Sequence, residues 1–200
     1  MKAVSALALT AAYAVLLLVF YVVHVWYFPV QVVFYSAMMD AALAAAVMTG
    51  VVFGIGHRRL PLGGFERILL VVIWLLGGYG FAISVPTVLD RSLSFYILEK
   101  LQQRGGGIQE SRIADVFTQE YLPEFRLVDV RLTEQLESGT ITIENGCVKL
   151  TEWGRTLATI SGYFRNHFLP KERLLAGEYT DALVDPFKNS KTGQMGYECE

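Results

Sequence analysis

The residue with the clearest chemical potential is Asp40, which stands roughly midway along an apolar stretch long enough to cross a membrane. A carboxyl group there is costly unless it is protonated or paired, so its default interpretation is functional. Tyr13 should lie at a similar depth in the preceding apolar stretch, and Ser36 is one turn before Asp40. We favour a hydrogen bond from Tyr13 or Ser36 that fixes helix packing. The alternative is contact of Asp40 with a partner subunit, a lipid headgroup or a translocated proton.

Other residue types that carry chemistry are sparse. The histidines, His24, His57 and His167, are dispersed, and no Cys or His stands at metal-ligand spacing. The sequence has no GxSxG, phosphate loop, HExxH or DxD motif. We therefore expect no catalytic residue, no metal and no cofactor. Cys147 and Cys199 are expected to be unrelated thiols, with pairing open if both face an oxidising compartment.

Three apolar stretches position Asp40 and dominate the first 89 residues, where only six charged side chains precede Asp90. They predict transmembrane helices over about 3–25, 30–54 and 67–86. The short connection that holds His24 and several aromatic residues is typical of the membrane interface. Small residues let helices approach closely, which suggests packing positions at Gly50, Gly54, Gly77 and Gly78.

The basic residues predict an orientation. Lys2 and the loop with Arg58, Arg59 and Arg67 must share one side, because two spans separate them. The positive-inside rule places that side in the cytoplasm and everything after Asp90 in the periplasm of a bacterial inner membrane. Bases soon after the third span, from Arg91 to Arg104, weigh against this orientation.

The remainder of the chain predicts a small folded domain over residues 90–169 and an extended tail over 170–200. Apolar periodicity predicts helices over 92–103 and 110–121, then a third from Pro123 to about 138. Two alternating runs around Asn145-Gly146 predict a β-hairpin. A closing helix should run from Thr151 to about Phe168, before Pro170.

This order of elements resembles the winged-helix family, and so does the local sequence of Leu136–Gly139 and Leu150–Ala158. The resemblance covers about residues 91–169 and implies a mainly α chain with an α+β winged-helix domain. Family members that bind DNA insert the third helix into the major groove. Here that helix carries four acids and two bases, a net charge of −2, which does not suit phosphates. We expect a protein-interaction module and no nucleic acid.

Two segments are candidates for contact with the membrane interface or a partner. Asp90 and Arg91 leave the third span, where capping of the next helix by Ser92 or Asp90 is the favoured role. Arg165, His167 and Lys171 stand among aromatic residues at the end of the closing helix. The tail is expected to lie across this domain or a partner.

Together these features predict a non-catalytic accessory subunit of an inner-membrane complex. The sequence of residues 85–96 resembles small bacterial membrane proteins that accompany envelope-polysaccharide glycosyltransferases. That resemblance implies an integral membrane partner, a glycosyltransferase. A membrane-tethered transcription regulator and a small membrane enzyme acting on lipid-linked substrates are the alternatives.

Overall fold

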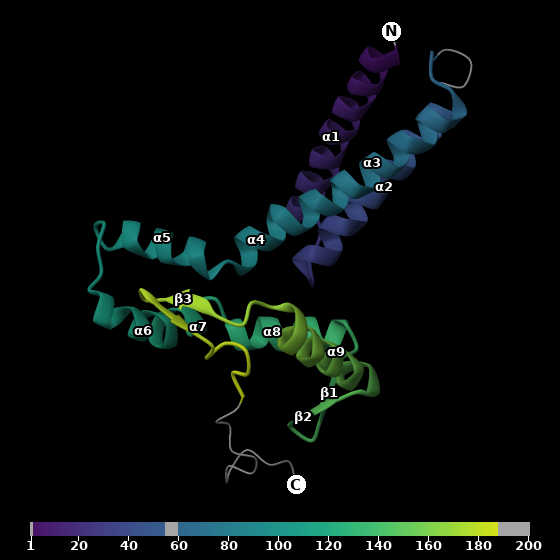
Figure 1. Cartoon of the computed structure of the whole chain (residues 1–200). Helices are drawn as coiled ribbons and strands as arrows, with labels where there is room; N and C mark the ends of the chain where they lie inside the picture. Colours follow the sequence, from purple (N-terminus) through teal and green to yellow (C-terminus); the bar gives the residue numbers. More distant parts are fainter. Residues whose placement is uncertain (1, 55–59, 188–200) are drawn as a thin grey trace. The chain divides into compact units, whose positions relative to one another are not determined.

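The computed structural model describes residues 2–54 and 60–187, and its mainly helical chain begins with three long helices. These are α1 (Lys2–Tyr27), α2 (Val33–Phe53) and α3 (Gly64–Ser84), which continues into α4 (Pro86–Arg91). All three spans, Lys2–Tyr27, Val33–Phe53 and Gly64–Arg91, are long and apolar enough to cross a membrane, as predicted (Figure 1). His57, Arg58 and Arg59 lie outside the described residues.

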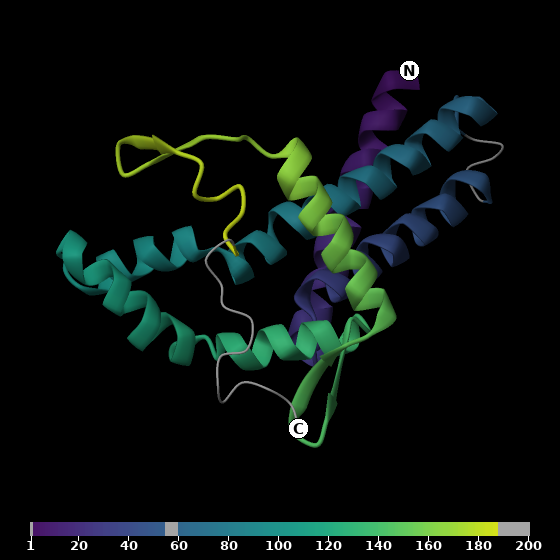
Figure 2. The ribbon, with the colours of Figure 1, turned by 60° about the horizontal axis from the view of Figure 1, so that its bottom comes forward.

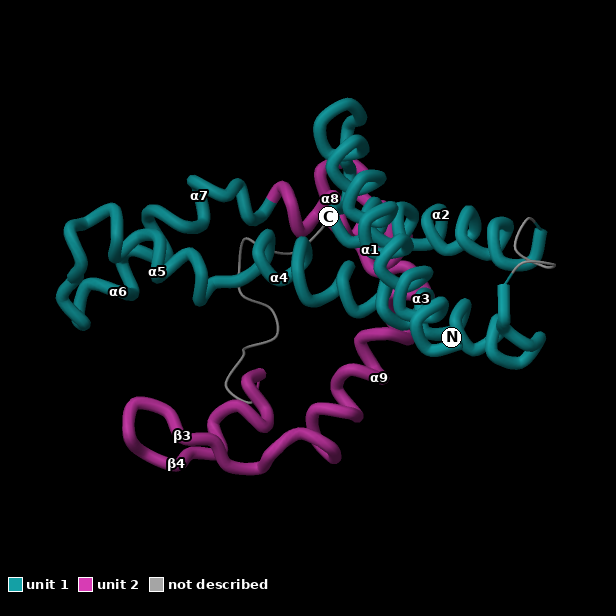
Figure 3. The backbone as a smooth tube through the Cα atoms, turned by 90° about the horizontal axis from the view of Figure 1, so that it is seen from above, with its two compact units in different colours: residues 1–128 teal, residues 129–200 magenta. Residues whose placement is uncertain are grey.

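The chain divides into two compact units, residues 1–128 and 129–200, coloured separately in Figure 3. The first contains the three apolar helices and the segments up to the start of α8 (Leu127–Glu137). The second contains the rest of α8 and all later helices and strands. The helices of the predicted winged helix are therefore divided between two units, and each unit is described by itself.

Large and small side chains alternate in the core of the three apolar helices. The ring of Trp74 is almost fully buried and stacks on Tyr13 at 5.7 Å between centroids. Its Nε1 donates a hydrogen bond to Thr10 Oγ1 at 3.2 Å. Gly78, one turn after Trp74, brings α3 close to both Tyr13 and Ala41. Aromatic stacking and a close glycine contact thus hold α1, α2 and α3 together.

The ends of the helices agree with the predicted pairing of sides. Lys2 Nζ lies 2.9 Å from Glu66 Oε1, which joins the first turns of α1 and α3. At the other end Pro86 occupies the first turn of α4, where a missing N–H costs nothing. Ser92 caps the next helix, α5 (Leu93–Gln103), because its Oγ accepts a hydrogen bond from Phe95 N at 3.3 Å.

The second predicted helix is interrupted and the third begins later than predicted. The segments are η2 (Glu110–Arg112), α6 (Ile113–Asp115), one stretch of π-helix, η3 (Val116–Tyr121), and α7 (Leu122–Glu124). Pro123 lies in the first turn of α7, but this helix ends at Glu124, and the third helix starts at Leu127 as α8. The cause is Arg126, whose φ of 43° is left-handed and breaks the helical path.

The predicted hairpin and closing helix are present in the second unit (Figure 2). β1 (Ile141–Glu144) pairs antiparallel with β2 (Cys147–Leu150), and Ile141 lies opposite Leu150. Asn145 and Gly146 both have positive φ, 54° and 77°, as a type I′ turn requires. Thr151 then caps α9 (Glu152–Phe168) through Gly154 N at 3.0 Å.

The described part of the predicted tail, residues 170–187, includes a short hairpin. β3 (Arg173–Leu175) pairs with β4 (Glu178–Thr180) across Ala176 and Gly177, which both have positive φ. Alternation around Ala-Gly is a weaker hairpin signal than Asn-Gly, which is why the sequence did not predict it. The described chain is thus mainly helical, with two small antiparallel sheets. Cys199, and with it the question of cysteine pairing, lies outside the described residues.

Candidate functional site

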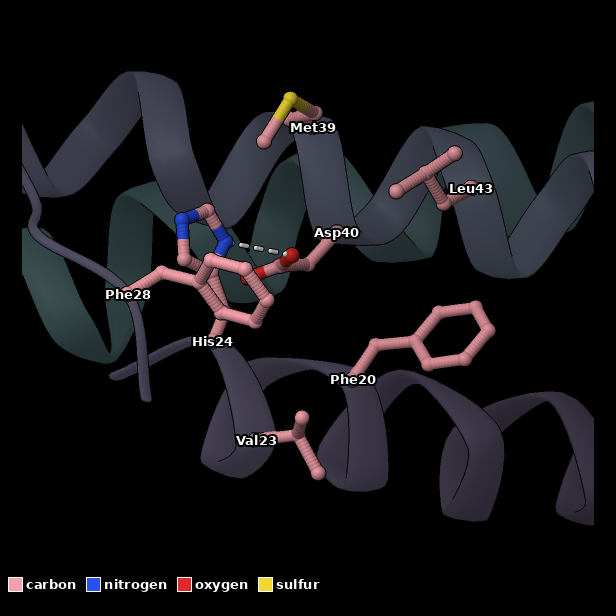
Figure 4. Close-up of a pocket in the computed structure, with 7 residues that line it drawn as sticks. All are labelled: Phe20, Val23, His24, Phe28, Met39, Asp40 and Leu43. Carbon is pink, nitrogen blue, oxygen red and sulfur yellow. Dashed lines mark hydrogen bonds and ion pairs between the residues drawn. The ribbon is translucent and has the colours of Figure 1, made fainter. Parts of the chain in front are cut away.

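A close pair of ionisable side chains, His24 and Asp40, joins α1 to α2. His24 Nδ1 lies 2.8 Å from Asp40 Oδ1, and the two side chains are 13% and 4% exposed. Figure 4 shows the imidazole of α1 directed towards the carboxyl group of α2, with the ring of Phe28 beside the pair and the ring of Phe20 on the Leu43 side of the hollow. An ionised Asp40 can only accept, so Nδ1 of His24 then carries the proton of this hydrogen bond.

The helix ends explain why these two residues meet. His24 lies in the last turn of α1, and its carbonyl oxygen accepts a hydrogen bond from Phe28 N at 2.9 Å. Asp40 follows the start of α2 at Val33 by two turns. Because the connection between the helices is short and reverses the chain, residues near the end of α1 lie level with residues near the start of α2.

The predicted partners of Asp40 were wrong for the same reason. Tyr13 lies eleven residues before His24, about three turns deeper along α1. It packs on Trp74, and its Oη is buried with no hydrogen-bond partner among the described residues. Ser36 is not bonded to Asp40 either and lines a different hollow. The sequence placed His24 in the interfacial connection, whereas α1 continues through it to Tyr27.

The second oxygen of Asp40 is left without a partner. Oδ2 is buried and accepts no hydrogen bond from any residue in the described part of the chain. Asp40 also lines a hollow of about 240 Å³ in an otherwise apolar surface of α1 and α2. The other residues around this hollow are Phe20, Val23, His24, Phe28, Met39 and Leu43. A buried acceptor beside an open, apolar hollow is suited to a hydrogen-bond donor that enters from outside.

His24 and Met39 line both this hollow and a second, more polar one. The second has a volume of about 350 Å³ and is lined by Pro29, Gln31, Val32, Tyr35, Ser36 and Met39 in addition to His24. The imidazole therefore borders both hollows and bonds the carboxyl group of Asp40 in one of them. The two ring nitrogens of His24 can each make a hydrogen bond, so one can bond Asp40 while the other bonds a different group.

A second group of charged residues, the Lys100 cluster, lies between α5 and residues 116–124. It consists of Tyr96, Lys100, Arg104, Glu120 and Glu124. Lys100 Nζ is 2.7 Å from Glu124 Oε1 and 3.0 Å from Glu120 Oε2. The Lys100 side chain is only 7% exposed. Tyr96 donates to Glu124 Oε2 at 2.9 Å, and Arg104 reaches Glu120 at the same distance.

The contacts of the Lys100 cluster shift the pKa values of its members in opposite directions. Hydrogen bonds from Lys100 are the main cause that lowers the pKa of Glu120 and of Glu124. The same bonds raise the pKa of Lys100, against the opposing effect of burial. Lys100 and the two glutamates are therefore charged near neutral pH, and their ion pairs join two helical segments. Its spacing by four, 96-100-104 and 120-124, was visible in the sequence but was not singled out.

The predicted interface residues belong to both units. Asp90 is exposed and Arg91 half-buried at the end of α4, in the first unit. In the second unit Arg165 is half-buried, and His167 stacks on Tyr163 at 4.2 Å between ring centroids. The amine of Lys171 donates a hydrogen bond to the carbonyl oxygen of Asn166. These residues therefore form two candidate surfaces, one in each unit.

Of the four predicted packing glycines, Gly78 makes the close helix–helix contact. A Cβ built on Gly78 would lie 2.4 Å from Tyr13 Oη and 2.7 Å from the Cβ of Ala41. On Gly50 or Gly77 it would meet no described atom within 4 Å, and on Gly54 only the backbone of Gly50. Gly50 and Gly77 are exposed, so they are available to a helix from outside the chain.

Comparison of the chain with protein-family models, with curated proteins and with solved structures finds no match. The site must be interpreted from its own chemistry. Within residues 2–54 and 60–187, no three His, Cys, Asp or Glu side chains are grouped so that they could hold a metal ion. The His24–Asp40 pair and its hollow are the best-defined candidate site.

Proposed function

We propose that this protein is a non-catalytic accessory subunit that binds another integral membrane protein through α1 and α2. Two observations carry the proposal: Asp40 Oδ2 is buried with no hydrogen-bond partner among the described residues, and the residue Asp40 lines a hollow. In the proposed complex, a transmembrane helix of the partner places a hydrogen-bond donor in this hollow.

The properties of the bilayer support a protein partner. Lipid tails offer no hydrogen bond, so a carboxylate oxygen that faced only lipid would keep its full desolvation cost. A side chain from a neighbouring helix removes that cost, and polar side chains commonly join transmembrane helices in this way. The rings of Phe20 and Phe28 can pack around the entering side chain.

The outer surfaces of the helices also suit assembly. Gly50 in α2 and Gly77 in α3 are exposed, and the space beside each is open among the described residues. Small residues on the outside of a membrane helix let a second backbone approach closely. Gly78 already serves this purpose inside the chain, so Gly50 and Gly77 remain for an external helix.

The finer parts of the proposal come from the sequence. The helix–helix–helix–hairpin–helix order supports a winged-helix domain used for protein contact, and its acidic third helix argues against DNA. The charge pattern supports a bacterial inner-membrane location with this domain in the periplasm. The resemblance of residues 85–96 supports a membrane glycosyltransferase of envelope-glycan synthesis as the partner.

Co-purification in mild detergent tests the proposal. The wild-type chain should retain a membrane protein, and Asp40→Ala should weaken that association by about 1–2 kcal/mol, or roughly fivefold to thirtyfold. Asp40→Asn, which keeps a polar group beside His24, should have a smaller effect. Tyr13→Phe is the matched control, because it removes a buried hydroxyl of the same helices that does not line the hollow.

Two results would contradict the proposal. One is a wild-type chain that leaves the membrane alone and monodisperse under conditions that preserve other membrane complexes. The other is an association that Asp40→Ala and Tyr13→Phe weaken equally, which would make Asp40 a packing residue. Thermal unfolding of each variant in the same detergent shows whether a loss of binding reflects a loss of folding.

A further inference from the structure

We propose that α9 lies on the surface of an anionic bilayer, with one apolar stripe among the lipids. The stripe consists of Trp153, Leu157, Ile160, Phe164 and Phe168. This inference is independent of the partner proposed for α1 and α2, because it concerns the second unit of the chain.

The stripe is continuous and exposed. Its members are spaced by four, three, four and four residues, which places them along one side of an α-helix. Their exposed fractions range from 37% for Leu157 to 65% for Phe168. The opposite side is polar, with Glu152, Arg155, Thr159 and Asn166. A soluble helix usually buries such a stripe, so its exposure along four turns requires an occupant.

The second unit attaches to a different side of α9. A Cβ on Gly154 would lie 2.0 Å from the carbonyl oxygen of Thr140 and 3.1 Å from the Leu150 side chain, so the hairpin β1–β2 packs at Gly154. Gly154 is one residue after Trp153 and therefore about 100° around the helix from it. The hairpin contact thus orients α9 and leaves the stripe uncovered.

Charge favours a lipid surface as the occupant. Residues 152–173 carry four bases (Arg155, Arg165, Lys171, Arg173) and two acids (Glu152, Glu172), a net charge of +2. The whole chain from Asp90 onward has 13 bases and 17 acids, a net charge of −4. The end of α9 and the residues after it carry Arg165, Lys171 and Arg173 against Glu172, so this segment is positively charged in a region that is acidic as a whole. Bases beside a Trp- and Phe-rich stripe match anionic headgroups above an acyl layer.

The three apolar helices add a second reason. These helices are able to anchor the chain in a bilayer, so the effective concentration of lipid near α9 is high. The helix α9 then needs only a low intrinsic affinity for the lipid surface. A stripe of five residues, with Arg165, His167 and Lys171 near its C-terminal end, is enough for such a contact. In this arrangement Arg165, His167 and Lys171, which the sequence placed at an interface, contact the lipid headgroups.

Lipid quenching of Trp153 in the full chain tests this arrangement. The chain is placed in nanodiscs of brominated lipid, with or without about one third anionic lipid. The contribution of Trp153 is the difference between the wild-type chain and Trp153→Phe, since Trp26 and Trp74 are common to both. Brominated lipid should quench Trp153, at least twofold more strongly in the anionic nanodiscs.

Two double variants separate the stripe from the polar side. Leu157→Gln with Ile160→Gln should abolish the lipid quenching of Trp153, whereas Thr159→Gln with Asn166→Gln should leave it unchanged. Far-UV circular dichroism confirms that α9 stays helical in both. If iodide in water quenches Trp153 instead, the stripe faces solvent and the proposal fails. If neither quencher reaches Trp153, protein covers the stripe, and the proposal fails equally.

Discussion

Replacing Gly78 by alanine should destabilise the three apolar helices, whereas the same change at the adjacent Gly77 should not. At Gly78 the new methyl carbon would lie 2.4 Å from Tyr13 Oη and 2.7 Å from the Cβ of Ala41. Both distances are shorter than real Cβ contacts, so two helices must move apart. At Gly77 no described atom lies within 4 Å of the new Cβ.

The two substitutions should differ in sign. Overpacking of a well-packed core costs about 1–3 kcal/mol, which lowers the ratio of folded to unfolded chain by roughly 5-fold to 150-fold. At Gly77 alanine relieves the helix penalty of glycine, a gain of about 0.5–1 kcal/mol. The neighbouring variants should therefore differ by roughly 1.5–4 kcal/mol in free energy of unfolding, although the chemical change is identical.

Reversible unfolding of the purified chain in mixed micelles, followed by the fluorescence of Trp74, measures this difference. Gly78→Ala combined with Tyr13→Phe should recover part of the loss, because one of the two clashing atoms is removed and Ala41 remains. Equal stability of the Gly77→Ala and Gly78→Ala variants would refute the close contact among α1, α2 and α3.

Two further predictions concern the region after the apolar helices. Gly154→Ala places a Cβ 2.0 Å from the backbone oxygen of Thr140 and should destabilise the second unit by about 1–3 kcal/mol. Faster hydrogen exchange in β1–β2 and α9 would report this loss. Gly162→Ala is the control and should not destabilise the unit, because no described atom lies within 4 Å of its new Cβ. In the Lys100 cluster the lowered pKa of both glutamates means that their stabilisation is complete above the unfolded pKa of about 4.3 and is lost as pH falls through the lower folded values. Because the pKa of Lys100 is raised, its contribution to the free energy of unfolding persists past about pH 10. The near-UV circular dichroism of the buried tyrosines should therefore stay constant from about pH 5 to 10 and change below about pH 4. A transition near pH 7 would contradict this.

Much of the local structure followed from the sequence because short-range rules decided it. Long uncharged stretches predicted the three apolar helices, and Asn145-Gly146 predicted the first hairpin. Thr151 marked the start of α9 by its capping hydroxyl. The boundary at Arg126 was missed, because a left-handed arginine depends on its surroundings and carries no sequence signal.

The candidate site was only half predicted. Asp40 was identified from its cost in an apolar helix, but its partner was not, because hydrogen bonding depends on how far each helix extends before the chain reverses. An error of a few residues in those ends moved the expected partner from His24 to Tyr13, about three turns away. The sequence did not predict the Lys100 cluster for a similar reason, because its two halves are about twenty residues apart in the chain.

The sequence alone determined that this protein has three helices able to cross a membrane, that one of them carries an acid in its middle, and that the later region is acidic. These three properties follow from the composition and periodicity of the sequence, which can be evaluated without knowing how the chain packs. Only the tertiary structure decided that Asp40 meets His24, that one of its oxygens stays unpartnered beside a hollow, and that the stripe of α9 is exposed. Which side chains form hydrogen bonds, and which are exposed, depends on how helices and strands pack, and this packing brings together residues that are far apart in the sequence.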